Sequence, residues 1–267
     1  MNEVGFSKEY TGLQLRYGAL KEHVANQIEL LHTLVCTIGP NIKARYMMFV
    51  GCLEYKAYEL KVEFSRWKRR FALRQAALNR GETPDLAAIE ATLKREFADF
   101  MQEIKRQAAE IKENARLFAY KSLSEEEDAA VRLAYLDAVK KLHPDLSPNL
   151  PQAAKDLWNE IQAAYAARDW AAVRLLASLV ESVASGKEDF ASAPDAVAAL
   201  REACEGLEAK SRELVSESAR IQKESPFTYK EFLADEEAVV ARQNELKMDI
   251  AELKAKIAKC EEEWNNG

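Results

Sequence analysis

Residues 124–165, SEEEDAAVRLAYLDAVKKLHPDLSPNLPQAAKDLWNEIQAAY, consist of two amphipathic segments joined by a short polar loop. Apolar residues recur in both segments at steps of three and four residues, the spacing of one face of a helix. The loop begins with the only His-Pro-Asp tripeptide in the chain, His143-Pro144-Asp145. The ring of Pro144 restricts the backbone there. This pattern predicts an antiparallel helical hairpin with a rigid tip.

The composition of the whole chain indicates an all-α protein. Only 9 Gly and 7 Pro occur in 267 residues, too few for the many turns of an all-β or α/β design. Ala, Leu, Glu, Lys and Arg dominate, and these residues have the lowest free-energy cost in a helix. Hydrophobic residues make up 48% of the chain, enough to bury a core. We expect long antiparallel helical hairpins of the coiled-coil type on either side of the central hairpin.

Charge, cysteines and histidines exclude several classes of function. The net charge of −6 argues against nonspecific binding to nucleic acid or to anionic membranes. The 4 Cys form no CxxC pair and the 3 His have no metal-ligand spacing, so we expect neither a metal nor another cofactor. The N-terminus lacks the pattern of a secretory signal, and no apolar run is long enough to cross a bilayer. With thiols that suit a reducing compartment, the protein is expected to be cytoplasmic.

Long apolar stripes before the hairpin predict a bundle of helices over residues 1–115. The first stripe ends at Gly39-Pro40, which we expect to terminate its helix. The second runs from there to Gly81, the expected C-terminal cap. A third begins after Thr83, which we expect to cap it. The length and apolar spacing of the third stripe match those of the second stripe. The helices that carry these two stripes should therefore pair antiparallel, with the first helix packed alongside them.

The central hairpin belongs to a domain that we place at residues 116–185. Ser124 and Glu127 match the S-x-x-E capping box that opens a helix. Asp169 is placed to cap a short helix after the hairpin. The polar stretch SGKEDFASAPD, residues 185–195, is the clearest linker in the chain.

The last part of the chain, residues 186–267, is expected to form an antiparallel coiled-coil hairpin. Apolar residues recur every seven positions from Phe232 to Cys260, the repeat of a coiled coil. Thr228 and Glu231 match a second capping box just before this repeat. The helix that precedes them has an unbroken apolar stripe, so the two helices are expected to pair.

The central hairpin carries a constellation that resembles the J domain of the DnaJ co-chaperone family. The first helix has an Ala-Tyr pair, a Lys-Lys pair and an apolar residue before His-Pro-Asp; the second has an aromatic residue, an Ile and another Ala-Tyr pair. These residues are Ala134-Tyr135, Lys140-Lys141, Leu142, His143-Pro144-Asp145, Trp158, Ile161 and Ala164-Tyr165. A lone tripeptide would carry little weight, whereas this spacing over two helices and a loop is specific. The resemblance covers about residues 116–180.

The resemblance implies a hairpin that docks on a DnaK-type chaperone and stimulates its ATP hydrolysis. The residues implied in this docking are His143, Pro144, Asp145, Lys140, Lys141 and Arg132. The effect on the chaperone would be allosteric, so the chain itself is not expected to be an enzyme. The long helices on either side are expected to bind a client or scaffold protein, or to form a homodimer.

The chain also departs from the pattern of that family. Leu136 and Asp137 stand between Tyr135 and Lys140, where the family usually adds basic residues, so the basic face is weaker. The family's first helix would fall at residues 117–121, and its usual apolar-Gly-apolar signature is absent. The Gly/Phe-rich linker and zinc-binding Cys clusters of full DnaJ proteins are absent as well, as in the minimal class. The alternative is a structural or adaptor coiled-coil protein whose degenerate J-like domain stimulates no chaperone.

The basic-aromatic stretch RWKRRF, residues 66–71, suggests a further hypothesis, a nucleic-acid-associated factor. Such binding would weaken steeply with salt. The other interpretation is that the aromatic residues lie on the apolar stripe and the basic residues pair with Glu90, Glu96 and Asp99 on the next helix. The second interpretation is favoured, and we expect no nucleic-acid or membrane partner.

Overall fold

The computed structural model describes residues 8–119, 124–183, 190 and 195–266. It is 87% helical, and its described residues include no β-strand. The expected all-α class is thereby confirmed. None of the described helices combines the length and the hydropathy that crossing a membrane requires.

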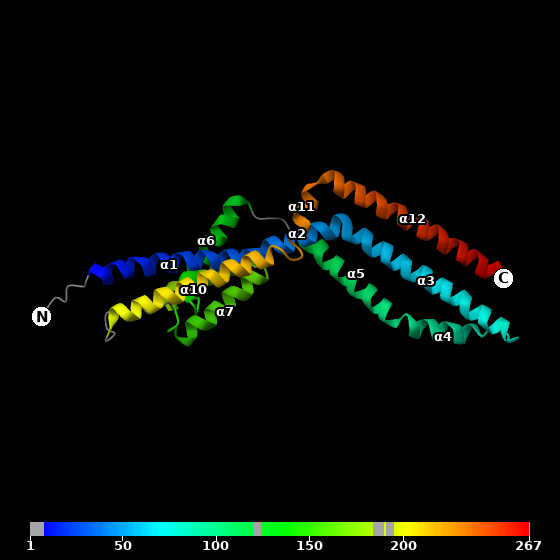
Figure 1. Cartoon of the computed structure of the whole chain (residues 1–267), viewed down its shortest axis with the longest axis horizontal. Coiled ribbons are helices and arrows are strands. Elements are labelled where there is room, and N and C mark those ends of the chain that lie inside the picture. The colour runs from blue at the N-terminus through cyan, green and yellow to red at the C-terminus, as the bar shows by residue number, and fades with distance from the viewer. Residues whose placement is uncertain (1–7, 120–123, 184–189, 191–194, 267) are drawn as a thin grey trace. The chain divides into compact units, whose positions relative to one another are not determined.

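A helix of 72 residues runs through the first part of the chain (Figure 1). It consists of α1 (Lys8–Thr33), η1 (Leu34–Ile38), α2 (Gly39–Tyr46), η2 (Met47–Gly51) and α3 (Cys52–Asn79). The two η segments are π-helical turns, which occur as short interruptions of α-helices. The predicted end of the helix at Gly39-Pro40 is therefore wrong.

The helix continues through Pro40 because a side chain replaces hydrogen bonds that proline disrupts. Proline has no N–H to donate to the preceding turn. Arg168 donates from Nε to the carbonyl of Cys36 and from Nη2 to that of Thr37, both at 3.0 Å. Arg168 itself has a φ of 59°, a left-handed backbone that costs a non-glycine residue free energy. A tertiary contact thus sustains a helix that the local sequence would end.

The chain folds into two compact units. Unit 1 comprises residues 1–40 and 121–227, and unit 2 comprises residues 41–120 and 228–267. The expected segments 1–115 and 186–267 therefore each contribute residues to both units. Most of the expected central segment, 116–185, belongs to unit 1.

Unit 1 packs the hairpin against helices from distant parts of the sequence (Figure 1). Its helices after α1 are α6 (Glu125–Leu142), α7 (Gln152–Ala166), α8 (Trp170–Ala177), α9 (Val180–Val183) and α10 (Ala196–Ile221). α1 packs on both α6 and α10. Glu9 pairs with Arg201 and Arg16 with Glu208, each across 192 residues of sequence, so α1 and α10 run parallel.

One apolar core joins α1 and α10 to the hairpin. Val24, Ala25 and Ile28 of α1 are at most 2% exposed. Leu207 and Leu214 of α10 belong to the same cluster. The hairpin and the helices that follow it contribute Val131, Tyr135, Ala138, Val139, Leu142, Leu146, Ala154, Leu157, Trp158, Ile161, Tyr165, Val173 and Val180. Because apolar burial is the main favourable term in folding, α1 is an integral part of unit 1.

Unit 2 is built on α3, with other helices packed along it (Figure 1). These are α4 (Leu86–Glu96), α5 (Ala98–Ala119) and α12 (Glu236–Asn266), which follows the short α11 (Tyr229–Ala234). Leu60 of α3 forms an apolar cluster with Leu253 and Ile257 of α12. The heptad pattern predicts that α10 and α12 pair with each other; their packing partners are α1 and α3 instead. A heptad stripe shows that a helix has a partner but not which helix it is.

Several predicted helix ends are confirmed. Ser124 Oγ accepts a hydrogen bond from the N–H of Glu127, whose carboxylate accepts one from the N–H of Ser124, as a capping box requires. Asp169 caps α8 by accepting a hydrogen bond from the N–H of Ala172. Gly81 has a φ of 75°, the left-handed conformation expected after a helix.

Two predicted caps are wrong. Asp85, not Thr83, caps α4, because its carboxylate accepts hydrogen bonds from two N–H groups of the first turn. Thr228 makes no capping hydrogen bond with its side chain, whereas the carboxylate of Asp235 accepts one at the start of α12. Asp85 and Asp235 also interact favourably with the positive ends of the dipoles of the helices that they cap, α4 and α12.

The substitution Ile28→Ala should destabilise unit 1 because it leaves a cavity in the core that α1 shares with the hairpin. Ile28 is 2% exposed, and such substitutions cost about 2–5 kcal/mol of unfolding free energy. Urea unfolding followed by circular dichroism measures the loss, and native-state hydrogen exchange in α6 and α7 assigns it to unit 1. Leu15→Ala, on the same helix but 74% exposed, should change the free energy by less than about 0.5 kcal/mol. A loss no larger than this control's would contradict the shared core.

Candidate functional site

The hairpin consists of α6 and α7, whose aromatic residues pair in antiparallel order. Tyr135 stacks on Tyr165 with ring centroids 4.0 Å apart. His143, just after α6, meets Trp158 of α7 edge to face at 5.3 Å. Later positions on α6 thus face earlier positions on α7, so the two helices run antiparallel. Of residues 117–121, where the resemblance places a preceding helix, those up to 119 form the end of α5, and the others lie outside the described residues.

The tip is a compact turn held by hydrogen bonds to His143. The backbone N–H of Asp145 donates to His143 Nδ1 at 3.1 Å, and the N–H groups of Leu146 and Ser147 donate to the His143 carbonyl, each at 2.9 Å. Pro144 and Asp145 are exposed, whereas Leu146 is 1% exposed and anchors the turn in the core. His143 therefore organises the turn from inside, and Pro144 and Asp145 form its outer surface.

Burial keeps the His143 ring neutral. Its side chain is 15% exposed. Desolvation lowers the pKa of His143 to about 4; the Asp145 carboxylate opposes this shift, and His32 and Lys210 add to it. The hydrogen bond from Asp145 requires an unprotonated Nδ1, so the ring carries its proton on Nε2.

Two basic residues of α6 pair with acidic residues of α1. Arg132 Nε and Nη2 lie 2.9 and 3.3 Å from the carboxylate oxygens of Glu29. Lys140 pairs with Glu22, two helical turns before Glu29 on the same helix. The side chain of Glu29 is almost fully buried, whereas that of Glu22 is exposed. α1 therefore supplies carboxylates along the basic face of α6.

The remaining charges of the tip are paired as well. Lys141 Nζ lies 2.8 Å from Asp137 within α6 and also pairs with Glu181 of α9. The Asp145 carboxylate lies 3.1 Å from Nζ of Lys210 on α10. Each charged residue that the resemblance implies in docking thus has an oppositely charged partner inside unit 1.

A buried polar network connects α1 to the hairpin beside these pairs. The Thr33 hydroxyl donates to Glu29 at 2.8 Å, and the Thr33 and Tyr165 hydroxyls lie 2.9 Å apart. His32 Nδ1 is hydrogen-bonded to the Tyr135 hydroxyl. Burial lowers the pKa of His32 and raises the pKa of Tyr135, so this bond joins two neutral groups. The network satisfies polar groups that the shared core would otherwise leave unpaired.

The sequence located the tip and the basic residues but not their partners. Glu22 and Glu29 are seven residues apart, a spacing that signals an acidic stripe on one face of α1. Glu181 and Lys210 carry no motif. No local pattern connects Lys210 with Asp145, because that contact depends on how α10 packs.

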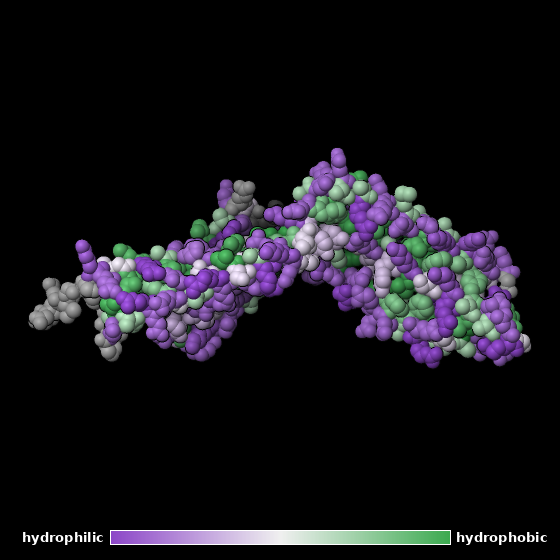
Figure 2. Space-filling model, viewed as in Figure 1, coloured by the Kyte–Doolittle hydropathy of each residue, from purple (hydrophilic) through white to green (hydrophobic). Residues whose placement is uncertain are grey.

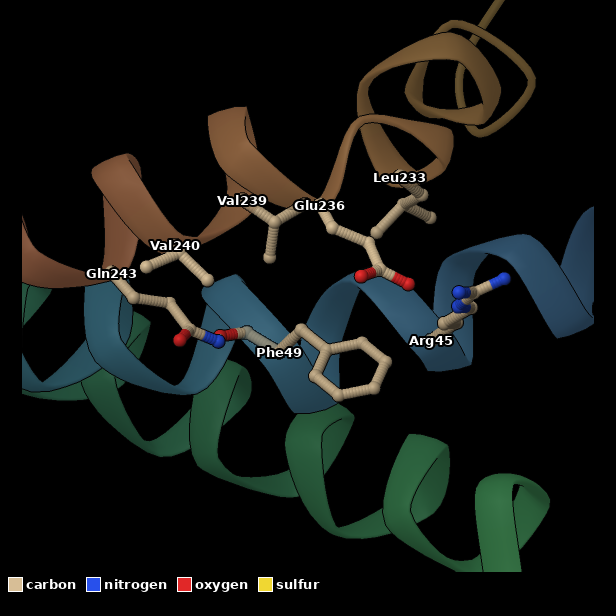
Figure 3. Close-up of a pocket in the computed structure, with 7 residues that line it drawn as sticks. All are labelled: Arg45, Phe49, Leu233, Glu236, Val239, Val240 and Gln243. Carbon is tan, nitrogen blue, oxygen red and sulfur yellow. The ribbon is translucent and has the colours of Figure 1, made fainter.

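Unit 2 contains a pocket of about 250 Å³ between the 72-residue helix and α11 and α12 (Figure 3). Its lining residues are Arg45, Phe49, Leu233, Glu236, Val239, Val240 and Gln243. Gln243 Nε2 donates to the Phe49 carbonyl, which belongs to the π-helical turn η2, at 2.8 Å. The lining is mainly apolar and offers no nucleophile. Among the described residues, no group of three or more His, Cys, Asp or Glu is placed to hold a metal ion. The tip is therefore the stronger candidate.

The basic-aromatic stretch of α3 is engaged within unit 2. Arg66 and Arg70 pair with Glu90 at 3.1 and 2.6 Å, and Arg69 pairs with Glu96 at 2.8 Å. Of the three predicted acids, Glu90 and Glu96 are confirmed as partners of these arginines, whereas among the described residues no such contact is found for Asp99. These contacts neutralise charges that a nucleic-acid site would need.

Comparison with known proteins finds no matching family model, no similar curated protein and no similar solved structure. What the chain does must therefore be inferred from its own residues and geometry.

The buried, neutral His143 predicts that unit 1 loses stability in mild acid. A group whose pKa is lowered by folding binds fewer protons when folded, so its contribution is complete above the ordinary pKa of 6.5 and is lost as the pH falls toward about 4. Between about pH 7 and pH 5, the unfolding free energy of the wild type should fall by about 1–2 kcal/mol more than that of His143→Gln. Urea unfolding at both pH values measures this difference. Equal pH dependence in the two proteins would contradict the buried neutral ring.

Proposed function

We propose that this chain is a J-domain co-chaperone, which docks on a DnaK-type chaperone through its His-Pro-Asp turn and stimulates ATP hydrolysis by that chaperone. The observation that carries the proposal is the exposure of Pro144 and Asp145 at the end of a hairpin whose turn is held by His143. The Lys140-Lys141 pair ends the helix directly before this turn. In this proposal the hairpin is a J-like domain between long helical arms, in a cytoplasmic protein.

The geometry of the tip suits recognition by a partner protein. Three hydrogen bonds to His143 and the buried side chain of Leu146 set the shape of the turn before a partner arrives. Such preorganisation reduces the entropy that binding would cost. Pro144 offers a rigid apolar surface and Asp145 a carboxylate, so the tip presents one apolar and one charged contact.

Arg132, Lys140 and Lys141 extend the proposed docking surface along α6. Their side chains remain 44%, 31% and 31% exposed despite their ion pairs. Because exposed ion pairs contribute little to stability, Lys140 and Lys141 can exchange an internal carboxylate for one on a partner at small cost. Positive charge beside the tip would also steer an acidic partner surface toward it.

The proposed effect on the chaperone is allosteric. A chaperone that binds the tip more tightly in its hydrolysis-competent state is shifted toward that state. In this mechanism the chain supplies a binding surface, while the chaperone supplies the catalytic groups and binds the nucleotide. No cofactor is needed on this chain.

We assign the binding of a client or scaffold, or the formation of a homodimer, to the long helices of unit 2. Phe100 and Met101 on α5 and Val240 and Met248 on α12 are exposed apolar residues. On the face shown in Figure 2, hydrophobic residues of this unit lie in patches between hydrophilic ones. Uncovered apolar residues on a surface favour contact with another protein.

A second candidate is a structural or adaptor protein whose J-like hairpin stimulates no chaperone. The observation that favours it is the pairing of Arg132, Lys140, Lys141 and Asp145 within unit 1. In this case the charged residues would serve to attach α1, α9 and α10 to the hairpin.

Steady-state ATP hydrolysis by a DnaK-type chaperone distinguishes the two candidates. The wild-type chain should stimulate it. His143→Gln removes the ring that shapes the turn and Asp145→Asn removes the exposed carboxylate, so each should reduce the stimulation by about tenfold or more. Glu126→Gln is the matched control, because it removes an exposed carboxylate in the first turn of α6, at the opposite end of that helix from the tip. It should stimulate as the wild type does.

Circular dichroism and urea unfolding must show that these variants are folded at the assay temperature. No stimulation by the wild type over a wide concentration range would favour the adaptor. Stimulation that survives both substitutions at the tip would show that the docking surface lies elsewhere.

A further inference from the structure

Three side chains from neighbouring helices, Glu22 of α1, Glu181 of α9 and Lys210 of α10, neutralise charges in the proposed docking surface. Each pairs with one charged residue of the tip or of the last turn of α6. We infer that these three residues, here named the charge cap, compete with the chaperone for the tip and thereby regulate docking. This inference rests on the function proposed above.

The competition takes place between side chains and does not require α1 to leave the hairpin. Val24 and Ile28 of α1 are buried in the shared core, so removing the helix would expose that core to water. By contrast, the side chains of Glu22 and Glu181 are 57% and 78% exposed. They can rotate away while the backbone of unit 1 stays in place.

Glu29 does not belong to the cap, although it pairs with Arg132. Its side chain is 9% exposed and also accepts a hydrogen bond from Thr33, so it is part of the buried network. Replacing it would leave Arg132 and Thr33 without their partner and would disturb folding. Glu29 has a structural role, whereas Glu22 and Glu181 are exposed and Lys210 is half-buried, so these three side chains can exchange partners.

Lys210 and Lys141 each have a second ion-pair partner that remains when the side chains of the charge cap move away. Lys210 lies 3.2 Å from Glu213 on its own helix as well as 3.1 Å from Asp145. Lys141 keeps Asp137, at 2.8 Å, when Glu181 moves away. Opening therefore leaves Lys141 and Lys210 paired, while water can solvate Lys140 and Asp145, whose side chains are 31% and 40% exposed, which keeps the cost small.

The cap also indicates the chemistry of the surface that replaces it. Glu22 and Glu181 are carboxylates that face the two lysines of α6, and Lys210 is an ammonium group that faces Asp145. A docking partner must reproduce this pattern.

The test uses the full chain with the triple substitution Glu22→Gln, Glu181→Gln and Lys210→Gln. Exposed ion pairs are each worth about a two- to fivefold change in an equilibrium constant, so the triple variant should reach half-maximal stimulation of the chaperone at about tenfold lower concentration than the wild type. In about 1 M salt, where charges are screened within about 3 Å, the two curves should converge.

A matched control excludes a general effect of charge. Two Glu→Gln changes add +2 and one Lys→Gln change adds −1, so the triple variant differs from the wild type by +1. Glu217→Gln also changes the charge by +1, on α10 but in an exposed pair with Arg220. It should leave the half-maximal concentration unchanged. Adding Asp145→Asn to the triple variant should abolish the gain, because the freed tip must make the contact.

The outcomes separate this inference from the proposed function. If the triple variant stimulates the chaperone more strongly and this gain is lost on adding Asp145→Asn, both the charge cap and the co-chaperone function are supported. Equal stimulation by the folded wild type and triple variant at low salt overturns the charge cap and leaves the co-chaperone function standing. If neither protein stimulates the chaperone, both are overturned. If Glu217→Gln gives the same gain in stimulation, the charge cap is also overturned, because the gain would then come from net charge alone.

Discussion

The apolar contact between α1 and the hairpin is the interaction on which unit 1 depends. Val24 and Ile28 lie in one core with Tyr135, Val139 and other residues of α6 and α7. A two-helix hairpin has too little apolar surface to be stable alone, and α1 and α10 provide the surface it lacks. Because the core fixes α1 against α6, it also determines which charged residues of α1 lie beside the basic face. The ion pairs of the charged residues at the tip and on α6 therefore follow from apolar packing.

The helix through Pro40 is a second constraint, and Arg168 contributes to it. Pro40 removes a backbone donor from the helix, and Arg168 supplies donors to the carbonyls of Cys36 and Thr37. Arg168 belongs to the turn after α7, so the hairpin in turn supports the helix that completes its core. The left-handed backbone at Arg168 is offset by these contacts.

Local features were predictable from the sequence, while pairings between distant segments were not. Composition indicated the all-α class, and the capping signals at Ser124 and Asp169 predicted the starts of α6 and α8 because a cap depends on residues within one turn. The same reasoning chose Thr83 where the structure uses Asp85, since several capping residues stood close together. The partner helices of α10 and α12 could not be predicted, because an apolar stripe fits any helix with a matching stripe.

For the candidate site, the sequence alone determined the His-Pro-Asp turn, the lysines beside it and the two helices that carry them. These features depend on spacing along a few turns of chain, where backbone geometry relates position to direction. Only the tertiary structure decided that His143 faces inward and that the tip's charges are paired. Those outcomes depend on burial and on contacts such as Lys140 with Glu22 and Asp145 with Lys210. Such contacts join residues far apart in sequence, and the packing of the shared core brings them together.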